Sequence, residues 1–396
     1  LIRDPMTESL VRGMMECGYM GYSPSALFLN GEYWGIHNIR EKFDARYFSE
    51  NFNVNPDNLD HLEYTTTQNG TEMQVVEGTL DHYSTMIDYI MNNDLNNAAI
   101  YNEIQQRMNV DSFIDHIIMT IYCANTSWGH NREWWRPREE NGKWQWLIVD
   151  LDRGFNINNS NTNLVDNLKN DYELFQYLLN SPFFVDRFVQ RSAAHLSNTF
   201  FAERMNSIVD SLGSMINLEM PRHIDRWGNE GGIPSMNFWE SELEEIKQFA
   251  ENRSTIVQNQ MMDELDMEGT VEVIVNVQPQ GAGKILVNDV PIIHPEGEGT
   301  FFKNKPLHLT VFPKPGYQFV GWDGVSDSTT IIYNCAMDTT FIAIFDVSNE
   351  FILPEVIEEN TTLTNAHPYV VTQDLLIPSD ILLTIQEDLE QCFLMK

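Results

Sequence analysis

The sequence is poor in basic residues and in cysteine. Its 396 residues include 24 Lys and Arg against 58 Asp and Glu, a formal net charge of -34. This shortage of positive charge excludes a general affinity for nucleic acid or anionic membranes. The four cysteines contain no C-x-x-C pair and are widely spaced: Cys17, Cys123, Cys335 and Cys392. This spacing excludes a thiolate metal site and a dense disulfide framework, and predicts four free thiols.

Long apolar runs are also missing. No stretch approaches the roughly 18 apolar residues that span a bilayer, so no transmembrane segment is expected. No signal-like run follows Leu1. We therefore expect a fragment of a longer protein, for which a missing targeting signal carries no information. With 42% hydrophobic and 11% aromatic residues, the chain is expected to fold into two or three domains.

Mixed helix and strand patterning predicts a first domain over residues 1–265. The segment Ser25–Glu41 predicts two strands around an Asn30-Gly31 turn. A helix is predicted with Asp111 as its N-cap. Its apolar residues recur at helical spacing: Phe113, Ile114, Ile117, Ile118 and Ile121. The region from Asp171 to Leu265 predicts further helices.

The composition changes near Glu268. From there apolar residues alternate with polar ones, and Pro and Gly residues interrupt the alternation. This pattern predicts a small all-β module over residues 269–346. Tyr317, Phe319 and Trp322 are expected to pack in its core. The last segment, 347–396, contains short β-rich runs and too little apolar surface for a stable domain of its own.

Two acids follow a predicted buried strand, Trp144–Val149. Asp150 and Asp152 come directly after it, before Arg153 and Gly154. An unpaired carboxylate costs several kcal/mol to bury, so acids in such a place need a cationic partner. In one interpretation the two acids end the strand and form a salt bridge with Arg153 or with another basic residue nearby. In the other they bind a divalent cation such as Mg²⁺, which prefers carboxylate and amide oxygens.

The preceding loop contains a second polar pair, His130 and Asn131. A strand predicted at Arg132–Arg136 and a turn at Asn141-Gly142 would return the chain so that Asp150 lies beside Asn131. An amide oxygen and a carboxylate side by side are suited to Mg²⁺. Protein-kinase-type folds use such a pair to hold the metal on nucleotide phosphates.

Three segments, in this order, carry a resemblance to a known family: NGEYWGIHNIRE, ANTSWGHNREWWRP and WLIVDLDRGF. They resemble the CotH kinase-like family, the spore coat protein H type of atypical protein kinase. The resemblance covers most of residues 1–265. It implies an α+β chain that begins with the C-terminal part of an atypical protein-kinase-like fold, binds ATP with Mg²⁺ and phosphorylates Ser or Thr of a protein partner.

The resemblance also implies roles for particular residues. Asp150 matches the magnesium-coordinating acid, and Asn131 lies where a second metal-binding amide is expected. Glu41 is expected on the nucleotide side of the cleft. Asp152 matches the second acid of the family's Asp-x-Asp, where it would orient Arg153 or support the metal ligands. His130 is expected to steady the catalytic loop.

Two departures from the family's pattern affect the expected activity. Where many members carry a loop aspartate that accepts the substrate proton, this chain offers only Thr126 or Ser127, whose hydroxyls are not bases at neutral pH. The amino-terminal lobe is expected before Leu1. The sequence leaves open a slow kinase, a kinase that uses another acid such as Asp152, and a nucleotide-binding pseudokinase that acts as a scaffold.

The C-terminal segments have weaker resemblances. Residues 269–346 resemble a β-grasp-like repeat of internalin-type bacterial surface proteins, and residues 347–396 resemble the first rungs of a right-handed parallel β-helix. Both imply an extracellular or bacterial cell-surface protein. The alternative to a kinase is then a cell-surface scaffold or adhesion protein that binds a surface partner.

Overall fold

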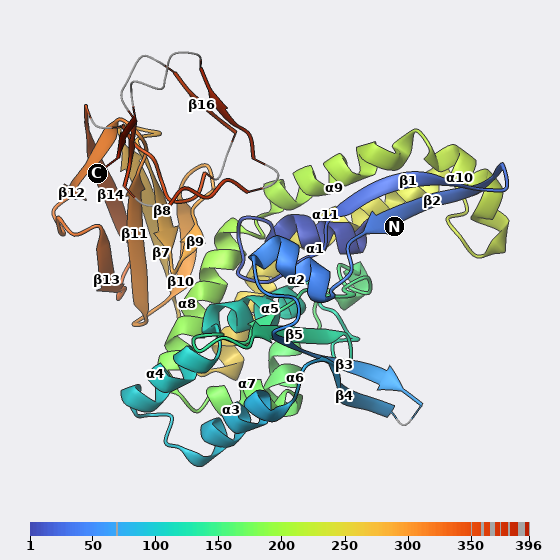
Figure 1. The fold of residues 1–396 in the computed structure, drawn as a ribbon, viewed down its shortest axis with the longest axis horizontal. Coiled ribbons are helices and arrows are strands. Elements are labelled where there is room, and N and C mark those ends of the chain that lie inside the picture. Colours follow the sequence, from blue (N-terminus) through green and yellow to red (C-terminus); the bar gives the residue numbers. More distant parts are fainter. Residues whose placement is uncertain are drawn as a thin grey trace. The chain divides into compact units, whose positions relative to one another are not determined.

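The computed structural model describes residues 1–68, 70–349, 351–357, 360–364, 369–372, 374–378, 381–386 and 393–395. The chain forms two compact units, Leu1–Gly269 and Thr270–Lys396. The first combines helices and strands, and the described part of the second consists of strands and loops (Figure 1). The predicted α+β class with a β-rich C-terminal part is confirmed.

The first unit is mainly helical. Its helices are α1 (Arg3–Val11), α2 (Ala45–Phe52), α3 (Asp81–Asn92), α4 (Ala98–Arg107), α5 (Val110–Tyr122), α6 (Leu164–Asp171), α7 (Glu173–Leu178), α8 (Pro182–Asn198), α9 (Ala202–Asn217), α10 (Met220–Trp227) and α11 (Met236–Glu264), with short 3-10 turns η1 (Ile157–Asn159) and η2 (Gly228–Glu230). Its strands are β1 (Tyr22–Leu29), β2 (Glu32–Arg40), β3 (Leu59–Thr67), β4 (Gly70–Glu77), β5 (Arg132–Pro137) and β6 (Gln145–Trp146). The helices predicted between residues 171 and 265 are confirmed as α7 to α11.

The predicted hairpin is confirmed as β1 and β2, an antiparallel pair. Asn30 and Gly31 have φ angles of 51° and 86°. Two consecutive residues with positive φ form the turn that matches the twist of a two-stranded hairpin. The hairpin runs beside α10 (Figure 1), and the Trp227 Nε1 of that helix donates a 2.6 Å hydrogen bond to the Trp34 carbonyl of β2.

The helix predicted near Asp111 is α5, and its five apolar positions are all fully buried. The predicted N-cap is wrong. Asn109 caps the helix, since its Oδ1 accepts a 3.1 Å hydrogen bond from the Ser112 N–H. Asp111 lies in the first turn and instead receives a 2.8 Å hydrogen bond from Arg187 of α8. Two cap-competent side chains two residues apart left the choice to the tertiary partner of Asp111.

The strand predicted at Trp144–Val149 is shorter than expected. Only β6, in the antiparallel sheet β4-β3-β5-β6, forms a regular ladder there. On its other side lies the connection between α1 and β1, where Gly18 donates a 3.1 Å hydrogen bond to the Trp146 carbonyl and accepts a 2.8 Å one from Ile148. A Cβ at Gly18 would lie 2.5 Å from Leu147 Cδ2, so any side chain at position 18 would displace the buried Leu147.

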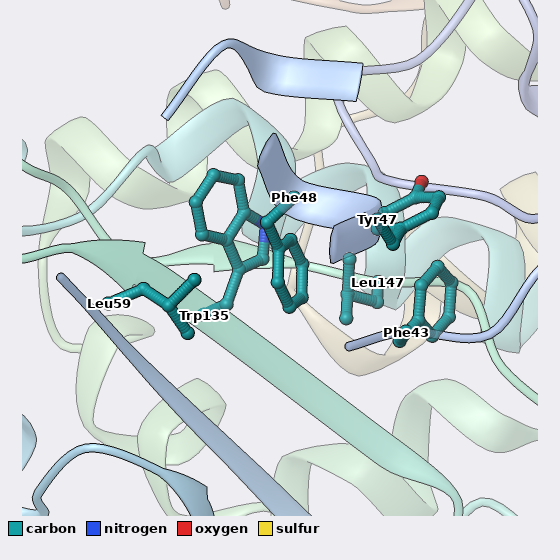
Figure 2. Close-up of a cluster of buried hydrophobic side chains, with 6 residues drawn as sticks. All are labelled: Phe43, Tyr47, Phe48, Leu59, Trp135 and Leu147. Carbon is teal, nitrogen blue, oxygen red and sulfur yellow. The ribbon is translucent and has the colours of Figure 1, made fainter. Parts of the chain in front are cut away.

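An aromatic cluster joins α2 to the sheet (Figure 2). The rings of Phe48 and Trp135 stack with centroids 4.4 Å apart, and Phe43 meets Tyr47 edge to face at 4.8 Å. Leu147, directly after β6, packs against the same cluster. Large buried rings of this kind fix the position of the strand end from which Asp150 follows.

The second unit begins with two four-stranded sheets. Its strands are β7 (Thr270–Gln278), β8 (Gly283–Val287), β9 (Val290–Pro291), β10 (Glu298–Phe302), β11 (Pro306–Pro313), β12 (Tyr317–Trp322), β13 (Thr330–Asn334), β14 (Thr339–Val347), β15 (Phe351–Ile352), β16 (Thr361–Leu363), β17 (Tyr369–Val371), β18 (Leu383–Ile385) and β19 (Phe393–Met395). The sheet orders are β10-β7-β14-β12 and β13-β11-β8-β9, and β7 and β14 run parallel.

The packing role predicted for Trp322 is confirmed, since its side chain is buried and its Nε1 donates to the Ser328 carbonyl at 3.1 Å. Tyr317 and Phe319 are half-buried. The short strands β15 to β19 pair in parallel, as stacked rungs would. The surface-repeat and β-helix resemblances stay predictions.

Three of the cysteines are free and buried: Cys17, Cys123 and Cys335. Cys392 lies outside the described residues. Among the helices described here, none is both long and apolar enough to span a bilayer.

Candidate functional site

Two loops meet at the end of β6. One follows α5 and runs from Ala124 to Asn131, and the other runs from Asp150 to Phe155. The Phe155 N–H donates a 2.8 Å hydrogen bond to the Cys123 carbonyl, which ties the second loop to the end of α5. A Cβ at Gly154 would lie 3.0 Å from that of Cys123, so the loops approach too closely for an unadjusted side chain there. The site is therefore built where backbone segments are packed directly together.

Asn131 and Asp150 are brought together, as the hairpin spacing predicted. The Asn131 Nδ2 donates a 2.6 Å hydrogen bond to the Asp150 Oδ2. Both residues have left-handed backbone conformations, with φ angles of 64° and 46°. Such conformations are uncommon outside glycine, cost free energy and concentrate at functional sites. Two strained residues that direct their side chains at each other make this pair the centre of the candidate site.

The carboxyl group of Asp150 lies in a negatively charged surrounding. Partial desolvation raises its pKa above the ordinary value, and so do the charges of Asp152 and Asp4 and a hydrogen bond with Asp152, while His130 opposes this shift. Within the described residues, no ion pair joins Arg153 to either acid. The structure therefore shows no salt bridge with Arg153, and of the basic residues nearby His130 acts on Asp150. The excess negative charge favours a bound cation.

Sequence reasoning missed a second part of this charged region. Arg40, at the end of β2, donates a 2.8 Å hydrogen bond to Asp4 of α1 and also contacts Glu8 one turn later. Burial raises the pKa of Glu8 from its ordinary 4.5 to about 8, although Arg40 acts in the opposite direction. The i, i+4 spacing of Asp4 and Glu8 could have predicted that the two acids lie on one face of a helix. No pattern in the neighbouring sequence identifies Arg40 as their partner.

A cavity of about 310 Å³ lies beside these acids. Its polar lining comprises Asp4, Asn38, Asp152 and the ion pair between Arg3 and Glu242, and its apolar lining includes Phe238 and Ile246 of α11. In the described part of the chain, Asp4 Oδ1 and Asn38 Oδ1 are buried without a hydrogen-bond partner. The cavity therefore combines unpartnered acceptors with apolar surface, as ligand sites do.

A protein-family model described as CotH kinase protein matches residues 1–257 of the chain. The chain belongs to the CotH kinase family. No curated protein matches it. The resemblance carried by the three segments is thereby confirmed, and the first unit is the kinase-like part of this CotH-family chain. The exposed acids, the strained pair and the cavity all lie within the matched residues.

Glu41 has a structural position in the CotH unit. Its Oε2 accepts a 2.6 Å hydrogen bond from the Gly21 N–H, and its Oε1 accepts one from Asn51 Nδ2 at 3.4 Å. Glu41 therefore ties the end of β2 to the entrance of β1 and to α2. Its expected place on the nucleotide side of the cleft stays a prediction.

The two hydroxyls that stand in place of the family's loop aspartate differ in environment. Ser127 is buried, and its Oγ donates a 3.0 Å hydrogen bond to the Asn125 Oδ1. Thr126 is exposed. A carboxylate at position 127 would face an acceptor oxygen, whereas position 126 has room and solvent for one.

The donor set of the CotH site fits a metal that arrives with a nucleotide. Among the described residues, no group of three or more His, Cys, Asp or Glu could hold a metal ion by itself. Mg²⁺ commonly takes only one or two protein ligands and completes its shell with phosphate and water. Asp150, with the amide oxygen of Asn131 after a half-turn of that side chain, supplies this minimal set.

Proposed function

We propose that this CotH-family chain binds ATP with Mg²⁺ and transfers the γ-phosphate to Ser or Thr of a protein partner. The pairing of Asn131 with Asp150 on two strained loops carries the proposal. It supplies one amide and one carboxylate, the protein ligands that kinase-type sites use. The cavity bordered by Asp152, which forms a hydrogen bond with Asp150, offers a place for a bound group.

In this proposal the protein acts mainly by positioning and charge. Asp150 and Asn131 would hold Mg²⁺, which when bound neutralises negative charge on the nucleotide phosphates. Asp152 is exposed and borders the cavity, so it is our candidate to accept the proton of the substrate hydroxyl. A missing general base commonly costs about 10²–10⁴-fold in rate. His130 would moderate the charge of Asp150.

Calorimetric titration of the chain with ATP, with and without Mg²⁺, tests binding. We expect magnesium-dependent binding that Asp150→Asn abolishes. Asp57→Asn, an exposed acid in the connection between α2 and β3, is the matched control and should leave binding unchanged. Binding that ignores magnesium or survives Asp150→Asn would refute the proposed site.

Transfer of radiolabelled γ-phosphate separates the kinase from the pseudokinase. A kinase should label Ser or Thr of itself or of a partner, and Asp152→Asn should reduce the labelling. Thr126→Asp, at the exposed loop position, should raise it, whereas Ser127→Asp should not, because Ser127 donates to Asn125.

A scaffold function is the second candidate. The hydroxyls in place of the loop aspartate favour it, as does the engagement of both Glu41 oxygens within the fold. A scaffold would bind nucleotide or a surface partner and transfer no phosphate.

We also propose an extracellular or cell-surface location. The net charge of -34 and the β-rich second unit support it. Protease treatment of intact cells that produce the natural protein should degrade it if it is exposed. A protein that stays intact until the cells are lysed would contradict this location.

A further inference from the structure

Arg132, the first residue of β5, is a buried cation held by aromatic rings. Its guanidinium carbon lies 4.4 Å from the ring centroids of both Tyr64 and Tyr172 and 5.5 Å from that of Trp128. Its Nη2 donates a 3.3 Å hydrogen bond to the Gly129 carbonyl. Within the described residues, Arg132 forms no ion pair with a carboxylate. Ring faces and a loop carbonyl therefore compensate its charge.

Asn125 holds the other end of the same loop. Its side chain is fully buried, and its Oδ1 accepts hydrogen bonds from the Ser127 N–H at 3.2 Å and from the Ser127 Oγ at 3.0 Å. Its Nδ2 and the Nε of Arg132 are both buried without a partner in the described part of the chain. Both residues line one cavity of about 10 Å³ beside Asn131. This is close to the space that a single water molecule needs.

We propose that Asn125 and Arg132 are positioning residues that hold the loop between them so that the Asn131 amide meets the Asp150 carboxylate. The loop's exit is fixed in the same way, because the Asn131 N–H donates a 2.9 Å hydrogen bond to the carbonyl of Tyr64, whose ring covers Arg132. The purpose of the ordered loop, to bind Mg²⁺-ATP, rests on the proposed function. The ordering of the loop does not depend on that function, so it is measurable without a nucleotide.

Hydrogen–deuterium exchange of the loop, residues 126–131, is the direct measurement. Arg132→Met keeps an apolar stem between the rings but removes the charge and the donors, and Asn125→Ala removes the acceptor for Ser127. Both should speed exchange of the loop amides about tenfold or more. Arg132→Lys should rescue part of the protection, since it restores the cation over the rings. Ser127→Ala is a milder variant for the case in which Asn125→Ala does not fold.

Arg138→Met is the matched control, because Arg138 follows the same strand but pairs with Asp60. It should leave loop exchange unchanged. In a parallel titration, Arg132→Met should weaken Mg²⁺-ATP binding about tenfold, with no such change for Arg138→Met.

Each outcome is decisive. Loop exchange that does not change in Arg132→Met, Asn125→Ala and Ser127→Ala overturns the proposal, and so does an increase of equal size in every helix of the unit. Faster loop exchange with unchanged Mg²⁺-ATP affinity shows that the two side chains order the loop without positioning the site, which also overturns it. If the unsubstituted chain binds no Mg²⁺-ATP, the proposed function fails, and local loss of loop protection still supports the positioning role.

Discussion

Asn131 and Asp150 carry the same conflict between stability and function. Each has a positive φ, which an L-residue adopts at a free-energy cost and glycine adopts freely. Asp150 also faces the negative charges of Asp152 and Asp4. If these two residues served only the packing of the fold, glycine or an uncharged residue would serve at a lower free-energy cost. The retained strain and charge repulsion therefore favour a ligand-binding role.

Asp150→Gly makes this testable. Glycine fits a φ of 46° and removes the crowded carboxylate, so the free energy of unfolding should stay level or rise by up to about 1 kcal/mol. Mg²⁺-ATP binding should be lost. Urea denaturation and calorimetry measure the two effects. Asn53→Gly, at the left-handed C-cap of α2 with φ of 53°, is the matched control for stability and should leave binding intact. A loss of stability above about 1 kcal/mol would show that the Asp150 carboxylate is structural.

The buried His116 of α5 should make the free energy of unfolding depend on pH. Burial lowers its pKa from 6.5 to about 4, with the charge of Arg132 acting in the same direction. The unfolded chain therefore takes up a proton between pH 6.5 and 4 that the folded chain does not. The stability from this group is complete above pH 6.5 and is lost as the pH falls toward 4, by about 3 kcal/mol.

The measurement is the difference in unfolding free energy between the parent and His116→Gln across this range. It should shrink as the pH falls, because the variant lacks the titrating group. A constant difference for His116→Gln would refute the assigned cause.

Helix α5 ends directly before the candidate loop, and a side chain from α11 completes that end. Arg253 is fully buried and donates to the carbonyls of Tyr122 at 2.9 Å and Ile121 at 2.6 Å, and to Ser160 at 2.6 Å. The last carbonyls of a helix lack partners within it. Arg253 therefore ties the end of α5, from which the first candidate loop begins, to Ser160, which follows the second candidate loop.

Arg253→Met should lower the free energy of unfolding of the first unit by about 3–5 kcal/mol, because the carbonyls of Ile121, Tyr122 and Ser160 lose the same buried donor at once. Urea denaturation followed by far-ultraviolet circular dichroism measures this loss. Lys247→Met on the same helix removes an exposed ion pair with Asp210 and should cost less than about 1 kcal/mol. Similar losses for both variants would mean that Arg253 contributes no more than a surface charge.

The whole chain divides at Gly269, where the first compact unit ends and the second begins. The change from the helical periodicity of α11 to the alternation of β7 marks the same place in the sequence. Two sheets with buried Val, Phe and Leu side chains give the second unit a core of its own.

The fragment Glu268–Asp346 should therefore fold alone. We expect a β-type circular dichroism spectrum, a cooperative thermal transition and a fluorescence spectrum typical of a buried Trp322. Trp322→Phe should lower the midpoint, since the indole is buried and hydrogen-bonded. An unfolded fragment, together with an intact chain that melts in one transition, would show that the module depends on the rest of the protein.

Local patterns predicted what depends on near neighbours in the chain. The Asn30-Gly31 turn, the apolar face of α5 and the alternation after Glu268 each follow from the conformational preferences of a few successive residues. The pairing of Asn131 with Asp150 was also predictable, because a hairpin between them sets their separation. Family membership followed from three short segments in the same way.

Only the tertiary structure decided which distant groups meet. Arg40 pairs with Asp4 and Glu8, and Arg253 completes the end of α5, across separations that no local pattern encodes. The N-cap of α5 moved to Asn109 because Arg187 is the tertiary partner of Asp111. A side chain's local preference is worth about 1 kcal/mol, whereas leaving a buried charge unpaired costs several. Packing between distant elements therefore determines whether a charged side chain caps its own helix or pairs with a residue far away in the sequence.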